Sequence, residues 1–144
     1  MATSTVPALK KNLLASLVAL PGFTGVQLSY GAPLPNPARE YVWLGDVEGD
    51  DVPAALGRNR HAETYNLTVI IQAVKPGTDQ EGATERAYAF RDLIDTQIRS
   101  DITVGGALGS GWAYVAGHFK LEELASDTQR GALLTIEVAC EART

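Results

Sequence analysis

The sequence is poor in the residues that build disulfides and metal centres. Cys140 is the only cysteine among 144 residues, and the two histidines, His61 and His118, lie far apart. A lone cysteine cannot pair within the chain, and its place in an alternating apolar stretch predicts a buried, unreactive thiol. One cysteine and two distant histidines are also too few for a typical zinc site. We therefore expect no disulfide framework and no bound metal.

Long apolar runs and excess positive charge are missing as well. No stretch reaches the roughly 18 apolar residues of a membrane-spanning helix. The first residues lack the basic flank, long apolar run and small-residue cleavage site of a secretory signal, so we expect none. The formal net charge is −5, which argues against wrapping nucleic acid. With 45% hydrophobic residues, the chain is expected to form a single domain over residues 1–144 with a core of its own. We expect the protein to be in the cytosol.

The clearest pattern lies in residues 63–74. Apolar and polar side chains alternate there, as in a strand with one buried face. β-Branched residues are frequent in this stretch, which agrees with the pattern. The apolar positions are Tyr65, Leu67, Val69, Ile71 and Ala73. We interpret the stretch as the central strand of an antiparallel sheet.

Two segments have helical periodicity instead. The first begins near Pro7, carries leucines at three- and four-residue steps, and ends at Pro21-Gly22. Thr3, Ser4 or Thr5 is expected to cap its start. The second runs from about Gly82 to Ser100, with Ala83, Ala87, Phe90, Ile94 and Ile98 on one face. Both apolar stripes predict helices that pack on a core.

Alternation predicts further strands around these elements. They cover residues 26–30, 40–44, 112–124 and 134–141. The last two are separated by a short turn and should form an antiparallel pair. The predicted fold class is therefore α+β: a mainly antiparallel sheet of about five strands, with two main helices packed on one face.

The segment 46–62 has an acidic half followed by a basic half. Its glycines and proline predict an irregular loop, longer than most hairpin connections. Two interpretations remain open, a solvated loop and a loop that contacts a partner. The acidic spacing is only distantly similar to a calcium loop. If the loop contacts a partner, the charged residues to test are Asp50, Asp51, Arg58 and Arg60.

No arrangement of residues predicts catalysis. His118 is not accompanied by a serine or cysteine motif, and the clustered carboxylates lack apolar neighbours that would raise a pKa for acid catalysis. The glycine-rich segment 105–111 lacks the lysine of a phosphate-binding loop. We expect no enzymatic activity, no catalytic residue and no cofactor.

The order of the predicted elements and the residue pattern within them resemble a known family. The residues concerned are Leu13-Leu14-Ala15-Ser16-Leu17, Leu20-Pro21-Gly22, Glu63-Thr64-Tyr65 and Ala83-Thr84-Glu85-Arg86-Ala87. Over nearly its whole length the chain looks like a tail terminator protein of long-tailed (siphovirus, lambda-type) bacteriophages.

This resemblance implies a structural protein of the virion neck that is assembled in the host cytoplasm. A homo-hexameric ring would cap the tail tube, end tail polymerisation and form the tail side of the head–tail junction. Its partners would be further copies of itself, the major tail tube protein and a head-completion or connector protein. DNA would pass through the lumen without specific binding, and no membrane would be involved. The alternatives are another neck protein (head-closure or adaptor), a general interaction module and a small cytosolic enzyme.

Overall fold

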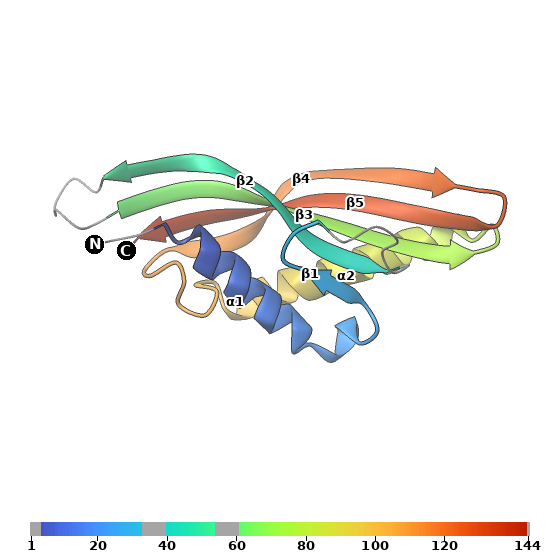
Figure 1. The fold of residues 1–144 in the computed structure, drawn as a ribbon, viewed down its shortest axis with the longest axis horizontal. Helices are drawn as coiled ribbons and strands as arrows, with labels where there is room; N and C mark the ends of the chain where they lie inside the picture. The colour runs from blue at the N-terminus through green and yellow to red at the C-terminus, as the bar shows by residue number, and fades with distance from the viewer. Residues whose placement is uncertain (1–3, 33–39, 54–60, 144) are drawn as a thin grey trace.

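A computed structural model describes residues 4–32, 40–53 and 61–143. Within these ranges the chain forms two α-helices, a short 3₁₀ helix and five strands (Figure 1). In order they are α1 (Val6–Val18), η1 (Pro21–Phe23), β1 (Gln27–Ser29), β2 (Tyr41–Pro53), β3 (His61–Pro76), α2 (Gln80–Ser100), β4 (Trp112–Ala125) and β5 (Gln129–Arg143).

The strands form one sheet in the order β1-β2-β3-β5-β4, with β3 in the centre. Only β1 and β2 run parallel, and the other neighbours are antiparallel. The two predicted closing strands do pair with each other as β4 and β5. The α+β class and the central position of residues 63–74 are thus confirmed.

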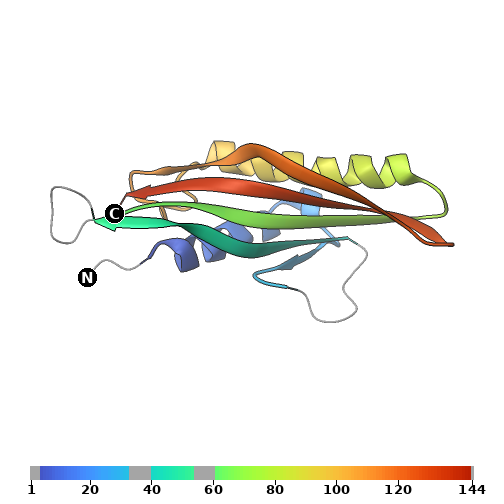
Figure 2. The same ribbon diagram turned by 90° about the horizontal axis from the view of Figure 1, so that it is seen from above.

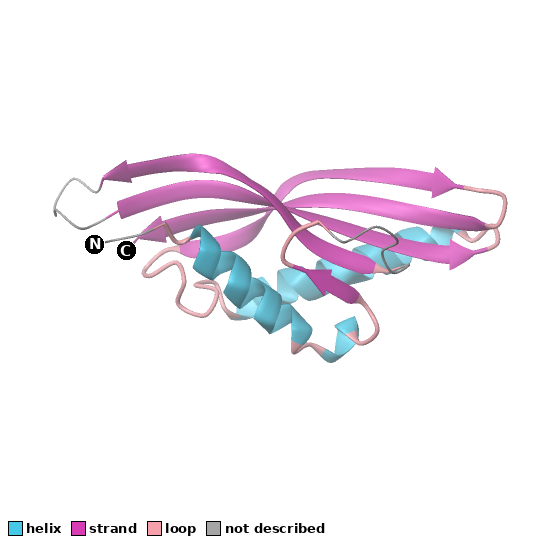
Figure 3. Cartoon of the chain, in the orientation of Figure 1, coloured by secondary structure: helices cyan, strands magenta, loops and turns pink. Residues whose placement is uncertain are grey.

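Both helices lie on the same face of the sheet (Figures 1 and 3). The face of β3 that meets them carries the row Leu67, Val69 and Ile71, which is fully buried. Against this row pack Leu9, Leu13 and Leu17 of α1 and Ala83, Ala87, Phe90, Ile94 and Ile98 of α2. Each buried leucine or isoleucine side chain contributes about 1.5–3 kcal/mol, so this layer stabilises the fold.

The two helices begin differently. At α2 the Asp79 carboxylate accepts a hydrogen bond from the Gly82 amide at 2.8 Å, as an N-cap should. Thr5 is the residue that precedes α1, but its side chain does not cap the helix. The Thr5 amide instead donates to the carboxylate of Glu63 on β3, at 2.7 Å. A carboxylate from a distant strand therefore accepts the hydrogen bond of the Thr5 amide at the start of α1 and fixes this end of the helix to the sheet.

Bulges interrupt β2 and β4 at the same level of the sheet. The β2 register shifts between Leu44 and Val47, which pair with Val69 and Leu67 of β3. The β4 register shifts between Val115 and Phe119, whose partners on β5 are paired with those same β3 residues. Bulges increase the local twist, and in Figure 1 the strands cross one another near this level.

The prediction of an irregular loop over 46–62 is wrong for most of its length. Residues up to Pro53 continue β2, and β3 begins at His61. Gly49 is tolerated because it lies tight against Thr64 and Tyr65, where a side chain would collide with the neighbouring backbone. Gly45 falls within the β2 bulge. The glycines therefore allow close approach and a bulge, and they do not end the strand.

We predict that Ile94→Ala lowers the free energy of unfolding by about 2–5 kcal/mol, because it opens a cavity between α2 and the sheet. Thr96→Ala, two residues further along the same helix and exposed to solvent, is the matched control and should change stability by about 0.5 kcal/mol or less. Denaturant titration of both variants tests this. Equal losses in the two would contradict the packing described for α2.

Candidate assembly interface

The two faces of the sheet differ in what covers them. One carries the helices. The opposite face, here called the bare face, has neither helix packed on it (Figure 2). By strand alternation and register its apolar side chains are Tyr41 and Trp43 of β2, Ile70 and Val74 of β3, Leu133 and Ala139 of β5, and Trp112, Tyr114 and Leu124 of β4. Its polar side chains are Glu48 and Asp50 of β2, Thr64, Asn66, Thr68 and Gln72 of β3, Thr135, Glu137, Glu141 and Arg143 of β5, and Lys120 and Glu122 of β4. Carboxylates outnumber basic groups on this face.

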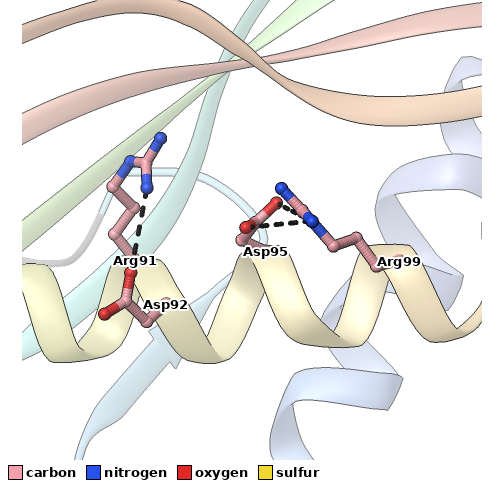
Figure 4. A network of polar contacts seen from close by, with 4 residues as sticks. All are labelled: Arg91, Asp92, Asp95 and Arg99. Atoms are coloured by element: carbon pink, nitrogen blue, oxygen red, sulfur yellow. Dashed lines mark hydrogen bonds and ion pairs between the residues drawn. The ribbon is translucent and has the colours of Figure 1, made fainter.

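The outward surface of α2 has a different character. Arg91 lies 3.8 Å from Asp92, and Arg99 lies 3.2 Å from Asp95 in the next turn (Figure 4). Asp92 and Arg99 are largely exposed, so these ion pairs each contribute little to stability. The other two members, Arg91 and Asp95, are only 27% and 24% exposed, so each pair joins a solvated charge to a partly covered one.

The structure places the predicted contact residues unequally. Asp50 and Asp51 lie in the second half of β2, opposite Thr64 and Glu63, and both are exposed. Since neighbouring residues of a strand point to opposite sides, Asp50 lies on the bare face and Asp51 on the helix side. Arg58 and Arg60 fall outside the described residues. The structure therefore brings the two aspartates to one end of the sheet.

Beside Asp51 a hollow of about 180 Å³ is lined by Val6, Val47, Gly49, Asp50, Asp51, Glu63 and Tyr65. Glu63 is only 6% exposed. Its two carboxylate oxygens accept hydrogen bonds from the Ser4 hydroxyl and the Thr5 amide. The Thr5 hydroxyl in turn lies 2.8 Å from the Tyr65 hydroxyl. These groups satisfy one another, which indicates a structural anchor for the start of α1.

Burial dominates the titration of the groups beneath this anchor. Desolvation raises the pKa of Tyr65, with a smaller opposing effect from its hydrogen bond to Thr5. Cys140 is the partner of Tyr65 on β5, and burial raises the pKa of its thiol to about 12. The thiol therefore stays protonated at neutral pH, in agreement with the inert cysteine predicted from the sequence.

Strand β4 carries large exposed apolar side chains, on both faces of the sheet, that the sequence analysis did not single out. Trp112, Tyr114, Phe119 and Leu124 are all exposed. Phe119, which is 53% exposed, meets the Tyr88 ring of α2 edge-on with centroids 6.3 Å apart. The Arg143 guanidinium lies over Trp112 at 5.6 Å. Alternation in the sequence predicts the strand, but it does not predict that these side chains remain exposed.

Other classes of site find little support in the described ranges. No three His, Cys, Asp or Glu side chains there are grouped closely enough to hold a metal ion. His118 is exposed beside the β4 bulge, away from Cys140 in the core. No helix in the part of the chain that the structure describes is long and apolar enough to cross a membrane.

Comparison with known proteins gives a likeness of fold. No protein-family model matches the sequence, and no curated protein matches it. Among solved structures, a chain from the virion of a native gene transfer agent particle superposes with a TM-score of 0.63. The two chains are 15% identical, and the superposition covers 98% of this chain and 100% of that one. The whole arrangement of helices and strands is therefore shared at very low sequence identity.

We predict that Cys140 makes stability fall above pH 9. The unfolded thiol ionises near its ordinary pKa of 9.0, while the folded thiol remains protonated until about pH 12. The unfolded state thus gains free energy from ionisation that the folded state lacks, and between pH 8 and pH 10 this lowers the free energy of unfolding by about 1 kcal/mol.

Cys140→Ala is the comparison variant, because it removes this ionisation and keeps Tyr65, whose own effect on the pH profile is present in both proteins. Its loss of stability between pH 8 and pH 10 should be smaller than that of the wild type by about 1 kcal/mol. Denaturant titrations at the two pH values measure the difference. Parallel pH profiles would show that the thiol is not desolvated in the folded protein.

Proposed function

We propose that this chain is a structural protein of a tailed-phage virion or a related phage-like particle. The observation that carries the proposal is the end-to-end likeness of fold to a chain of a gene transfer agent virion. Because the likeness spans 98% of this chain and 100% of that one, it concerns the whole fold and not a shared motif. The role is assembly with other virion proteins, without an enzymatic reaction.

Within the particle, we assign the chain to the tail terminator. The resemblance of residues 13–17, 20–22, 63–65 and 83–87 to that family supports this assignment. In this role, copies form a ring, hexameric in the family, that caps the tail tube and ends its growth. The opposite side of the ring receives the head-completion or connector protein.

The bare face suits the lining of such a ring. The helices make one side of the subunit thicker, so a ring of these sheets closes most easily with the helices outside and the bare face inside. Glu48, Asp50, Glu137 and Glu141 then face the channel, against Lys120 and Arg143. Net negative charge repels DNA phosphate, so the DNA passes without adhering.

The charged residues of segment 46–62 are proposed to make contacts within the neck. Asp50 and Asp51 stand at one end of the sheet, where a neighbouring subunit or the tail tube can reach them. Arg58 and Arg60 follow them in the sequence and supply the opposite sign. Opposite charges on one segment favour a head-to-tail contact between copies.

Deleting the gene from the virus and examining the particles by electron microscopy tests the assignment. Overlong or headless tails are expected if the chain ends tail growth. Empty, leaking heads would instead assign it to head closure or to an adaptor, the other neck roles. Particles of normal form and infectivity would contradict any structural role.

We further predict that the double variant Arg58→Glu, Arg60→Glu reduces incorporation into tails several-fold, because it removes the basic charges proposed to meet an acidic neighbour. The matched control is Lys11→Glu, Arg99→Glu, which reverses two charges on exposed positions of α1 and α2. Complementation of the deletion by each variant, followed by counting of tails joined to heads, gives the measurement. Equal incorporation of both variants would exclude these arginines from the interface.

A further inference from the structure

The sheet has two open edges within the described residues. At one edge, β4 pairs with β5 on one side only. At the other, β1 covers β2 only over Tyr41–Trp43 and leaves the rest of β2 without a strand beside it. Natural proteins usually cover or blunt long edge strands, because exposed backbone groups recruit another strand. Two such edges on one subunit need an explanation.

The open stretches lie at opposite ends of the sheet. The start of β4 is partly covered, since the Ala113 amide donates to the Ile102 carbonyl at 2.8 Å. Its open stretch is therefore the far half, Phe119–Ala125. On β2 the open stretch is Val47–Asp50, beyond the bulge. In the sheet order β4 runs antiparallel to β2, so the two stretches have the directions needed to pair between copies.

The far half of β4 combines charged residues with large exposed apolar side chains. Residues Phe119–Ala125 are exposed on both sides of the strand except for Leu121, which is half-buried. Phe119 and Leu124 are large apolar side chains that remain 53% and 41% exposed. Figure 2 shows this end of the β4–β5 hairpin turning away from α2. Within the described residues nothing covers these two side chains fully, which favours a partner that does.

We propose that the open half of β4 in one copy adds to the open half of β2 in the next, so that the sheet continues from subunit to subunit. This inference rests on the ring proposed above and identifies the strands that close it. Because the open stretches lie at opposite ends, each copy is displaced along its neighbour. Such a stagger between strands is what closing a sheet into a barrel requires.

The charges suggest a register for this pairing. With Lys120 opposite Glu48, antiparallel pairing places Glu123 opposite Gly45, whose carbonyl accepts a hydrogen bond from the Lys10 amino group at 3.4 Å. The same register places Glu122 opposite Asp46, a like-charge pair that weakens the contact. The attractive contacts are therefore Lys120 with Glu48 and Glu123 with Lys10.

The test is cysteine cross-linking of the double variant Lys120→Cys, Glu48→Cys. Both positions are exposed, and the native Cys140 is buried and should not react. A short bismaleimide is applied to the purified protein at high concentration and to particles that carry the variant. Head-to-tail pairing through β4 and β2 is expected to give a ladder of covalent multimers on a denaturing gel.

Two controls test whether the cross-links are specific to the contact between β4 and β2. Glu85→Cys with Glu48→Cys replaces the β4 position by an exposed one on α2 and should give no ladder. Lys120→Cys alone should give no dimer, because a dimer there would mean that two β4 strands pair with each other, which overturns the proposal. Absence of the ladder from particles that contain the protein also overturns it.

The outcomes separate this inference from the function above. If the protein is found in the neck of particles but does not cross-link, the neck function stands and the edge pairing is wrong. If the protein is absent from particles, the function is wrong, and the purified protein alone decides the pairing: a ladder supports it, and none overturns it.

Discussion

The pairing of β3 with β5 is the interaction on which the rest of the structure depends. The ladder extends from Ala62 and Arg143 to Pro76 and Gln129 without a register shift. Because side chains alternate along both strands, an uninterrupted register places the buried residues of the two strands, such as Leu67, Val69 and Ile136, on one face. That face can be shielded from water only by another layer, and α1 and α2 supply it.

The position of α1 is a consequence of this ladder. Glu63, near the start of β3, points to the helix side and accepts hydrogen bonds from Ser4 and Thr5. A buried carboxylate is tolerated because the first amides of a helix are donors that need a partner. The same contact ties the beginning of the chain to the centre of the sheet. The polar cluster at this place is therefore part of the architecture.

The outer strands behave differently from the central pair. Both β2 and β4 carry a bulge at the same level, and both leave part of their edge open. In the described part of the chain, the helices cover one face of the sheet. The other face carries no helix, and parts of both edge strands have no neighbouring strand. The chain thus buries its core with its own helices and leaves strand edges exposed within the described residues. The fold itself recurs in a virion chain of 15% sequence identity.

Low identity with a shared fold also has a physical reason. Such a sheet requires only that apolar residues alternate in register and that two amphipathic helices cover one face, and many sequences meet these conditions. Charges at the edges and on the bare face are not constrained by these conditions and are free to differ between chains of the same fold.

The sequence by itself determined the central strand, both helices and the α+β class, because those elements depend on periodicities of 2 and 3.6 residues that are local properties. It also indicated the inert cysteine. Only the tertiary structure decided that β2 continues past Gly45 and Gly49 to Pro53, since a glycine in a strand is acceptable only where a neighbour, here Thr64 and Tyr65, approaches closely. The anchoring of α1 by Glu63 and the exposure of Phe119 and Leu124 were likewise decided by tertiary structure. Both depend on which distant segments meet, and local patterns carry no information about that.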